Sequence, residues 1–157
     1  MSQDNTTPAT ARSSTHKPIG YLVKRIDQEL DRYVDGLLRA RHGVGRGHWQ
    51  VLRSVSDRPG LNRAEFAEEA KVFYDERQLA ELIDALVDKG WIRQEDSAAG
   101  TLMSLTAEGE RGFDAMRVTQ DGTWTTLTQG LTEESYYQVL GHLELMLDNL
   151  ERADPAG

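Results

Sequence analysis

The chain has 157 residues, of which 38% are hydrophobic and 28% charged, a composition typical of one compact globular domain or of a small domain with helical extensions. It contains no cysteine, which excludes disulfides, thiolate metal sites and cysteine nucleophiles. No apolar run approaches the roughly 18 residues of a membrane span. The polar N-terminus lacks the apolar stretch of a secretory signal, so we expect a cytoplasmic protein without a membrane partner.

The net charge of −8 is unevenly distributed along the chain. Residues 1–60 contain ten Lys and Arg against six Asp and Glu, whereas residues 61–106 contain five against ten and residues 107–157 three against ten. The basic N-terminal part is compatible with binding to nucleic acid, while the acidic middle segment argues against it.

The first predicted elements are a tail and two helices. Residues 1–17 are rich in Ser, Thr, Asn and Pro, have no hydrophobic period and are predicted to be disordered. From Pro18 onward apolar residues recur at steps of three and four, which predicts one amphipathic helix up to the segment HGVGRG at 42–47. A shorter helix around Leu52 follows and ends before Gly60.

Two capping boxes predict the next two helices. Asn62 is followed three residues later by Glu65, and Asp75 is followed by Gln78, each beside an apolar staple pair. The first box begins a short helix. The second begins a longer, leucine-rich helix that ends at Gly90.

The last predicted elements are a hairpin and two helices. Residues 91–105 form two short extended runs around the small residues at 97–100, which predicts a β-hairpin. Thr106 and Thr132 are predicted to cap the two helices. The helix after Thr106 is expected to be irregular near its end, because it contains glycines and a threonine cluster.

This order predicts a mainly α protein with a small β-hairpin wing. A winged helix-turn-helix lobe at 45–106 is expected between helical dimerisation regions at 18–44 and 107–152, with a short tail at 153–157. The apolar stripes of the two terminal helices are too long for one small lobe to cover, so we expect a homodimer. The predicted dimerisation residues are Ile19, Leu22, Ile26, Tyr136, Leu140, Leu143 and Leu147.

Three segments resemble the MarR family of bacterial regulators, namely GHWQVLRSVSDRPGLNRAEFAEEA, LAELIDALVDKGWIRQED and LMSLTAEGE. The likeness extends from about Ile19 to Leu150. It implies a dimer with two winged lobes that binds double-stranded DNA at a pseudo-palindromic operator, usually as a repressor, and that in many members is released by a small aromatic or phenolic ligand. The chain departs from the family in its wing, where Ser97 and Ala99 replace the usual Asp and Arg.

The second helix of a helix-turn-helix presents its first residues to base edges in the major groove. Arg77 can pair with guanine and Gln78 with adenine, so these two side chains are predicted to select the DNA sequence. The predicted phosphate or wing contacts are Arg63, Lys71 and Arg93. The alternative for each basic residue is a solvated surface charge or a surface ion pair.

A cleft beside the N-terminal helix is predicted to be lined by Tyr33, Trp49 and Arg53, a combination that suits an aromatic acid. The alternative is that both aromatic residues belong to the core or to an interface.

No metal site, cofactor or enzymatic activity is expected. The histidines lack the spacing of metal ligands, and no phosphate loop, dinucleotide fingerprint or nucleophile elbow occurs. The competing function is a MarR-like dimer that has lost DNA binding and acts through ligands or protein partners. The acidic middle segment and the altered wing favour that alternative.

Overall fold

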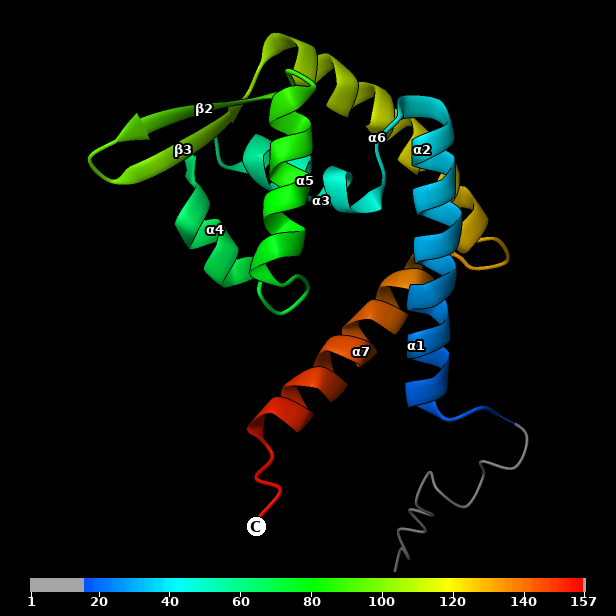
Figure 1. Cartoon of the computed structure of the whole chain (residues 1–157). Helices are drawn as coiled ribbons and strands as arrows, with labels where there is room; N and C mark the ends of the chain where they lie inside the picture. The colour runs from blue at the N-terminus through cyan, green and yellow to red at the C-terminus, as the bar shows by residue number, and fades with distance from the viewer. Residues whose placement is uncertain (1–15, 157) are drawn as a thin grey trace, which may run out of the picture. The chain divides into compact units, whose positions relative to one another are not determined.

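The computed structural model describes residues 16–156, and Figure 1 labels its helices and strands. The predicted N-terminal tail therefore lies outside the described residues, except for its last two positions. The chain divides into two compact units, and the boundary between Arg117 and Val118 falls inside a helix. None of the helices in the described part combines the length and the apolar character that crossing a bilayer requires.

The elements of the first unit follow the predicted order, with two additions, a π-helical turn and a short first strand. They are α1 Ile19–Leu30, η2 Asp31–Asp35, α2 Gly36–His42, α3 Arg46–Asp57, β1 Leu61–Asn62, α4 Arg63–Ala70, α5 Glu76–Asp88, β2 Ile92–Ser97, β3 Gly100–Leu105 and the first half of α6 Ala107–Leu127. The second unit contains the end of α6 and the helix α7 Glu133–Arg152.

The predicted N-terminal helix is continuous but changes its winding in the middle. The segments α1, η2 and α2 form one continuous helix, drawn blue to cyan in Figure 1, in which η2 is a π-helical turn. Gly43 ends this helix with φ 72°, a left-handed conformation that glycine adopts without strain. The helix has two different environments, because α1 has no buried residue whereas Val34 and Leu38 belong to the core of the lobe.

The sheet of the lobe has the strand order β1–β3–β2, and both pairings are antiparallel. The predicted hairpin is confirmed, with Ile92 opposite Leu105 and Ser97 opposite Gly100. The additional strand β1 pairs Leu61 with Met103. It was not predicted, because two residues are too few to show the alternation that marks a strand.

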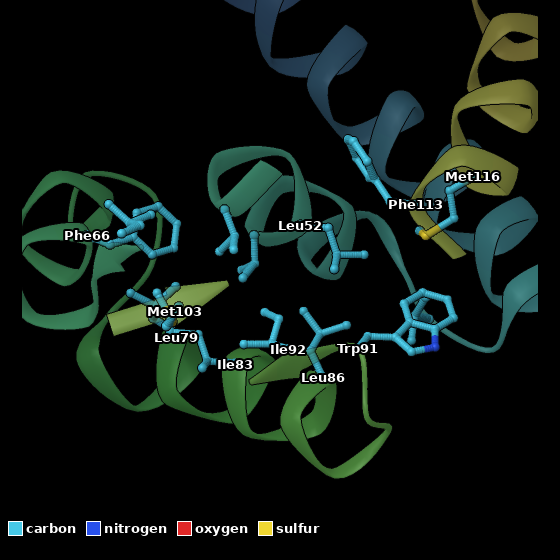
Figure 2. Close-up of a cluster of buried hydrophobic side chains, with 14 of the residues drawn as sticks. Leu52, Phe66, Leu79, Ile83, Leu86, Trp91, Ile92, Met103, Phe113 and Met116 are labelled. Atoms are coloured by element: carbon cyan, nitrogen blue, oxygen red, sulfur yellow. The ribbon is translucent and has the colours of Figure 1, made fainter. Parts of the chain in front are cut away.

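One hydrophobic cluster connects α3, α4, α5, the sheet and the start of α6, and Figure 2 shows its central side chains. Leu52 on α3 and Leu86 on α5 are 0% exposed and belong to this cluster. Phe113 and Met116 join the cluster from α6. The core therefore fixes the three helices and the hairpin relative to one another.

Two glycines bring α6 close to Trp91 at the beginning of the hairpin. A Cβ atom on Gly109 would lie 2.0 Å from the Trp91 carbonyl oxygen, and one on Gly112 would lie 2.5 Å from the indole ring. The backbones are joined at this point, because the Thr106 N–H donates to the Trp91 carbonyl at 3.0 Å. Only glycine permits this approach.

The predicted caps of three helices are confirmed. The Asp75 carboxylate accepts a hydrogen bond from the Gln78 N–H at 2.7 Å, and the Gln78 side-chain carbonyl accepts one from the Asp75 N–H at 3.0 Å. The hydroxyls of Thr106 and Thr132 each accept a hydrogen bond from the backbone N–H three residues later, at 3.0 Å.

The irregular end predicted for the helix after Thr106 is wrong, because α6 is unbroken from Ala107 to Leu127. Threonine hydroxyls near its end donate to backbone carbonyls one turn earlier, as from Thr125 to Asp121 at 3.2 Å. Such bonds satisfy the hydroxyls within the helix, so the cluster does not interrupt it.

Candidate nucleic-acid interface

The segments α4 and α5 form a helix-turn-helix whose turn is held to the end of the first helix. The N–H groups of Phe73 and Tyr74 both donate to the Ala70 carbonyl, at 2.9 and 3.0 Å. The turn places Val72 and Phe73 in solvent, where these residues are 81% and 79% exposed. The helix α5 then begins at its capping box, and its N-terminus carries the partial positive charge of the helix dipole.

The predicted base-reading residue Arg77 lies in the first turn of α5, and its side chain is 88% exposed. Its Nε donates to the Glu81 carboxylate one turn later at 3.0 Å. This is an exposed pair within one helix, so the guanidinium remains accessible to a ligand that competes with the carboxylate.

Gln78, the second predicted base reader, is already used by the fold. Its side-chain carbonyl accepts a hydrogen bond from the Asp75 N–H. A bidentate contact with adenine needs the carbonyl and the amino group together, so base reading and helix capping compete for one side chain. The sequence contained both signals at this position, and their conflict could have been recognised there.

Arg63 joins three elements of the lobe. Its guanidinium donates to the Gln94 side chain on β2 at 2.6 Å and to the Asp84 carboxylate on α5 at 3.1 Å. The side chain is 27% exposed. The structure therefore gives Arg63 an internal bridging role beside its predicted contact with phosphate.

The other two predicted phosphate or wing contacts are exposed. Lys71 follows α4 and pairs with Glu68 at 2.6 Å. Arg93 lies on β2 opposite Ser104, and no acceptor among residues 16–156 pairs with its side chain. Arg77, Lys71 and Arg93 are thus exposed, whereas the Arg63 side chain is largely covered.

The wing is held by Asn62, a contact that the sequence analysis missed. The Asn62 carbonyl caps α4 by accepting from the Ala64 and Glu65 N–H groups, while its amino group donates to the Ala99 carbonyl at 2.6 Å. Asparagine carries both a donor and an acceptor, which makes the double contact possible. Glu65 makes no reciprocal bond in the described structure, so only the Asn62 half of the predicted capping box forms.

The hairpin tip also has its own hydrogen bonds, which surround the two positions where the chain departs from the MarR pattern. The Ser97 hydroxyl donates to the Gly100 carbonyl at 3.0 Å and accepts from the Ala99 N–H at 3.1 Å. A small-residue turn therefore closes the wing without the Asp and Arg of the family.

Carboxylates accompany most basic groups of the helix-turn-helix. Besides the pairs of Arg63, Lys71 and Arg77, Arg58 at the end of α3 pairs with Glu69 at 2.7 Å. The hydrogen bond from Arg58 lowers the pKa of Glu69, and the one from Lys71 lowers the pKa of Glu68, so both carboxylates are charged at neutral pH. This arrangement reduces the positive potential of the surface.

The structure places the three predicted effector residues in different surroundings. Trp49 stacks on Phe113 with ring centroids 4.6 Å apart, and Tyr33 is 41% exposed on η2. Arg53 lines a groove between α3 and α4 whose lining includes neither aromatic residue. No three imidazole or carboxylate groups in residues 16–156 converge as metal ligands would.

The predicted dimerisation residues lie on helices without any buried residue. In the first unit, Ile19, Leu22 and Ile26 on α1 are 51%, 44% and 50% exposed. In the second unit, Leu147 on α7 is 56% exposed, and Tyr136 packs edge-on against Trp124 with centroids 4.3 Å apart. Leu140 and Leu143 are partly exposed on the same helix.

Comparison of the sequence with family models and with curated proteins gives no match. Comparison with solved structures does. The S. aureus MepR–DNA complex is 22% identical, with 85% of this chain and 96% of that chain covered at a TM-score of 0.70. A MarR transcriptional regulator from Methanosarcina mazei is 20% identical, with 83% and 88% covered at a TM-score of 0.73.

A third similar structure is a Mycobacterium tuberculosis MarR family protein in complex with p-aminosalicylic acid. It is 24% identical, with 83% of this chain and 98% of that chain covered at a TM-score of 0.66. The element order, the helix-turn-helix and the hairpin described above agree with these likenesses. The chain has the winged-helix fold of the MarR-family transcriptional regulators.

Proposed function

We propose that the protein is a dimeric DNA-binding transcriptional regulator that acts as a repressor at a pseudo-palindromic operator. The observation that carries the proposal is the exposed first turn of α5, where Arg77 is 88% exposed on the second helix of a helix-turn-helix. One of the structural neighbours is a DNA complex, which supports the same function. Arg77 is the proposed reader of a guanine, and Lys71 and Arg93 are the proposed phosphate or wing contacts.

The ion pair of Arg77 does not prevent this role. A solvent-exposed pair such as Arg77–Glu81 stabilises a protein by only about 0–1 kcal/mol. A bidentate contact between arginine and guanine contributes about 1–3 kcal/mol to base discrimination. Exchange of the carboxylate for a base edge is therefore favourable when the correct base is present.

Dimerisation is proposed through α1 and α7, because each helix has an apolar face that its own unit leaves exposed. A two-fold dimer would present two copies of α5 to half-sites about one helical turn of DNA apart. Sedimentation analysis of the purified chain tests this part directly. A monomer at micromolar concentration would contradict it.

The test of DNA binding starts with selection of bound sequences from a random library. On the selected operator, Arg77→Ala is expected to lose about 1–3 kcal/mol of discrimination at one base pair in each half-site. Glu81→Gln releases Arg77 and is expected to strengthen binding by about fivefold. Glu110→Gln, which removes the same charge on α6, serves as the control. Undiminished discrimination by Arg77→Ala would refute the assignment.

An aromatic acid is the proposed effector of the regulator. The M. tuberculosis neighbour holds p-aminosalicylic acid, and Arg53 offers a cation suited to a carboxylate. An increase in melting temperature with such acids supports this part of the proposal. No increase across a panel of aromatic acids would count against it.

A second candidate function is a MarR-like dimer that has lost DNA binding and acts through ligands or protein partners. Residues 61–106 favour it, because they contain twice as many acidic as basic residues, and carboxylates pair with Arg63, Lys71 and Arg77. Binding to a pool of genomic fragments at low and at moderate salt separates the two functions. Retention of specific fragments at moderate salt supports the regulator, and no retention at low salt supports the second candidate.

A further inference from the structure

A groove of about 370 Å³ lies on the helix-turn-helix, between α3, α4 and the turn that leads into α5. Val51, Phe66 and Ala70 contribute its buried apolar lining. Arg53 from α3 and Phe73 from the turn also line it. The volume lies within the range of about 300–1,000 Å³ that small-molecule sites occupy.

Polar contacts brace two parts of the groove. The Arg58 guanidinium binds both oxygens of Glu69, at 2.9 and 2.7 Å, and so links the end of α3 to α4. The Tyr74 hydroxyl donates to the Gln50 side-chain carbonyl and links the turn to α3. These bonds connect side chains from elements that are separate in sequence, so they hold the groove open in the protein without a ligand.

Arg53 differs from the other arginine that lines the groove. Arg58 is neutralised by Glu69, whereas no carboxylate or other acceptor in residues 16–156 pairs with Arg53. An unpaired guanidinium beside an apolar surface is suited to a molecule that has one carboxylate and an apolar body.

Phe73 supports the same ligand chemistry. The residue is 79% exposed, although it lines the groove together with the buried Phe66. An apolar ring seated between these two side chains would remove part of the Phe73 surface from water, which is favourable. The turn needs no large apolar residue for its backbone hydrogen bonds, so the fold of the turn does not account for this exposed ring.

We infer that the groove between α3, α4 and the turn before α5 binds a small carboxylated aromatic molecule, with Arg53 holding the carboxylate and Phe73 covering the ring. The inference deepens the effector part of the proposed function and rests on it. It moves the site from the predicted surroundings of Tyr33 and Trp49 to the base of the helix-turn-helix. It does not depend on DNA binding, so it is tested on the free protein.

The experiment is a titration of the isotope-labelled full chain with benzoate, followed by amide chemical shifts in NMR spectra. Saturable shifts are expected at the amides of groove residues in α3 and α4 and of Phe73, while the amide of Tyr33 and the indole N–H of Trp49 stay unchanged. Benzamide keeps the ring without the charge, and acetate keeps the charge without the ring. Each is expected to bind about tenfold more weakly than benzoate, because a hydrogen bond to a charged group and the burial of a ring each contribute at least that factor.

Two variants and a control assign the binding to the groove. Arg53→Gln is expected to weaken benzoate binding about tenfold, and Ser54→Leu, which narrows the groove without a change of charge, is expected to weaken it as well. Arg41→Gln removes another exposed arginine charge, on α2, and is expected to bind like the parent protein. The spectrum of each variant shows directly whether it is folded.

The inference is overturned if folded Arg53→Gln binds benzoate as tightly as the parent protein, or if benzamide or acetate binds equally well. It is also overturned if the largest shifts are those of the Tyr33 amide and the Trp49 indole N–H. In that last case the effector part of the proposed function survives and only the site is wrong. Absence of any chemical-shift change at millimolar benzoate would contradict the proposal that this groove binds a carboxylated aromatic molecule. Failure of a wider panel of aromatic acids to raise the melting temperature would independently contradict the effector itself.

Discussion

Replacement of Gly109 by alanine is expected to destabilise the first unit by about 3 kcal/mol. The new methyl group would lie 2.0 Å from the Trp91 carbonyl oxygen, whereas non-bonded heavy atoms need about 3.5 Å, so the helix or the strand must move by more than 1 Å. The obstacle is a backbone atom that cannot rotate away. The carbonyl is also fixed, because it accepts a hydrogen bond from the Thr106 N–H.

The magnitude follows from three contributions. Overpacking of a tightly packed site costs about 1–3 kcal/mol. The displacement also strains two hydrogen bonds of Thr106, to Trp91 at 3.0 Å and to the Gly90 carbonyl at 2.5 Å, and each contributes about 1 kcal/mol. Alanine regains about 1 kcal/mol through its higher helix propensity. The net loss of about 3 kcal/mol corresponds to a melting temperature lower by roughly 6–12 °C for a chain of this size.

Urea denaturation followed by circular dichroism, at one fixed protein concentration, measures the loss. Gly36→Ala is the matched control, because Gly36 is helical and a Cβ atom there would meet nothing within 4 Å. That variant is expected to gain up to about 1 kcal/mol. The close approach of α6 to Trp91 would be refuted if Gly109→Ala unfolded at the same urea concentration as the parent protein.

Two further predictions concern side chains with capping roles. Asn62→Ala is expected to lose about 1–2 kcal/mol of stability. Asn62→Asp keeps the acceptor for α4 and loses only the donor to Ala99, so it is expected to lose less stability than Asn62→Ala. Equal losses of the two variants in urea denaturation would contradict the double role of Asn62. Burial is the largest cause that lowers the pKa of His48 below 6.5. The imidazole of the unfolded chain therefore binds a proton at higher pH than that of the folded chain, and the free energy of unfolding falls as the pH drops below about 6.5. His48→Asn, which retains an acceptor for the Gly45 N–H, is expected to make this decline shallower in denaturation measurements between pH 5 and pH 8, and an unchanged profile would contradict the assignment.

The helix boundaries could be predicted from sequence because their signals are local. The box of Asp75 and Gln78, the hydroxyls of Thr106 and Thr132, and the left-handed Gly90 each act within a few residues of the chain. The hairpin was predictable for the same reason. The π turn and the strand β1 were not, because neither has a short-range signature that distinguishes it from an α-helix or a loop.

The candidate site was less predictable because its contacts connect distant parts of the chain. Arg63 qualified as a phosphate contact by its position, yet its partners Asp84 and Gln94 lie 21 and 31 residues further along. The groove beside Arg53 likewise depends on a turn about 20 residues away in sequence. Periodicity identifies which face of a helix is apolar, but it does not show which charged side chains of other elements will meet there.

The π turn between α1 and α2 has a consequence for evolution. An α-helix rotates by about 100° per residue, so the extra residue held by η2 turns the apolar positions before it away from those after it. One helix can therefore supply Val34 and Leu38 to the core while Ile19 and Leu22 point elsewhere. Loss or gain of a single residue at 31–35 would rotate the apolar face of α1 by that angle relative to the face that packs into the core. A different protein surface could then be presented by α1 without the addition of a new helix.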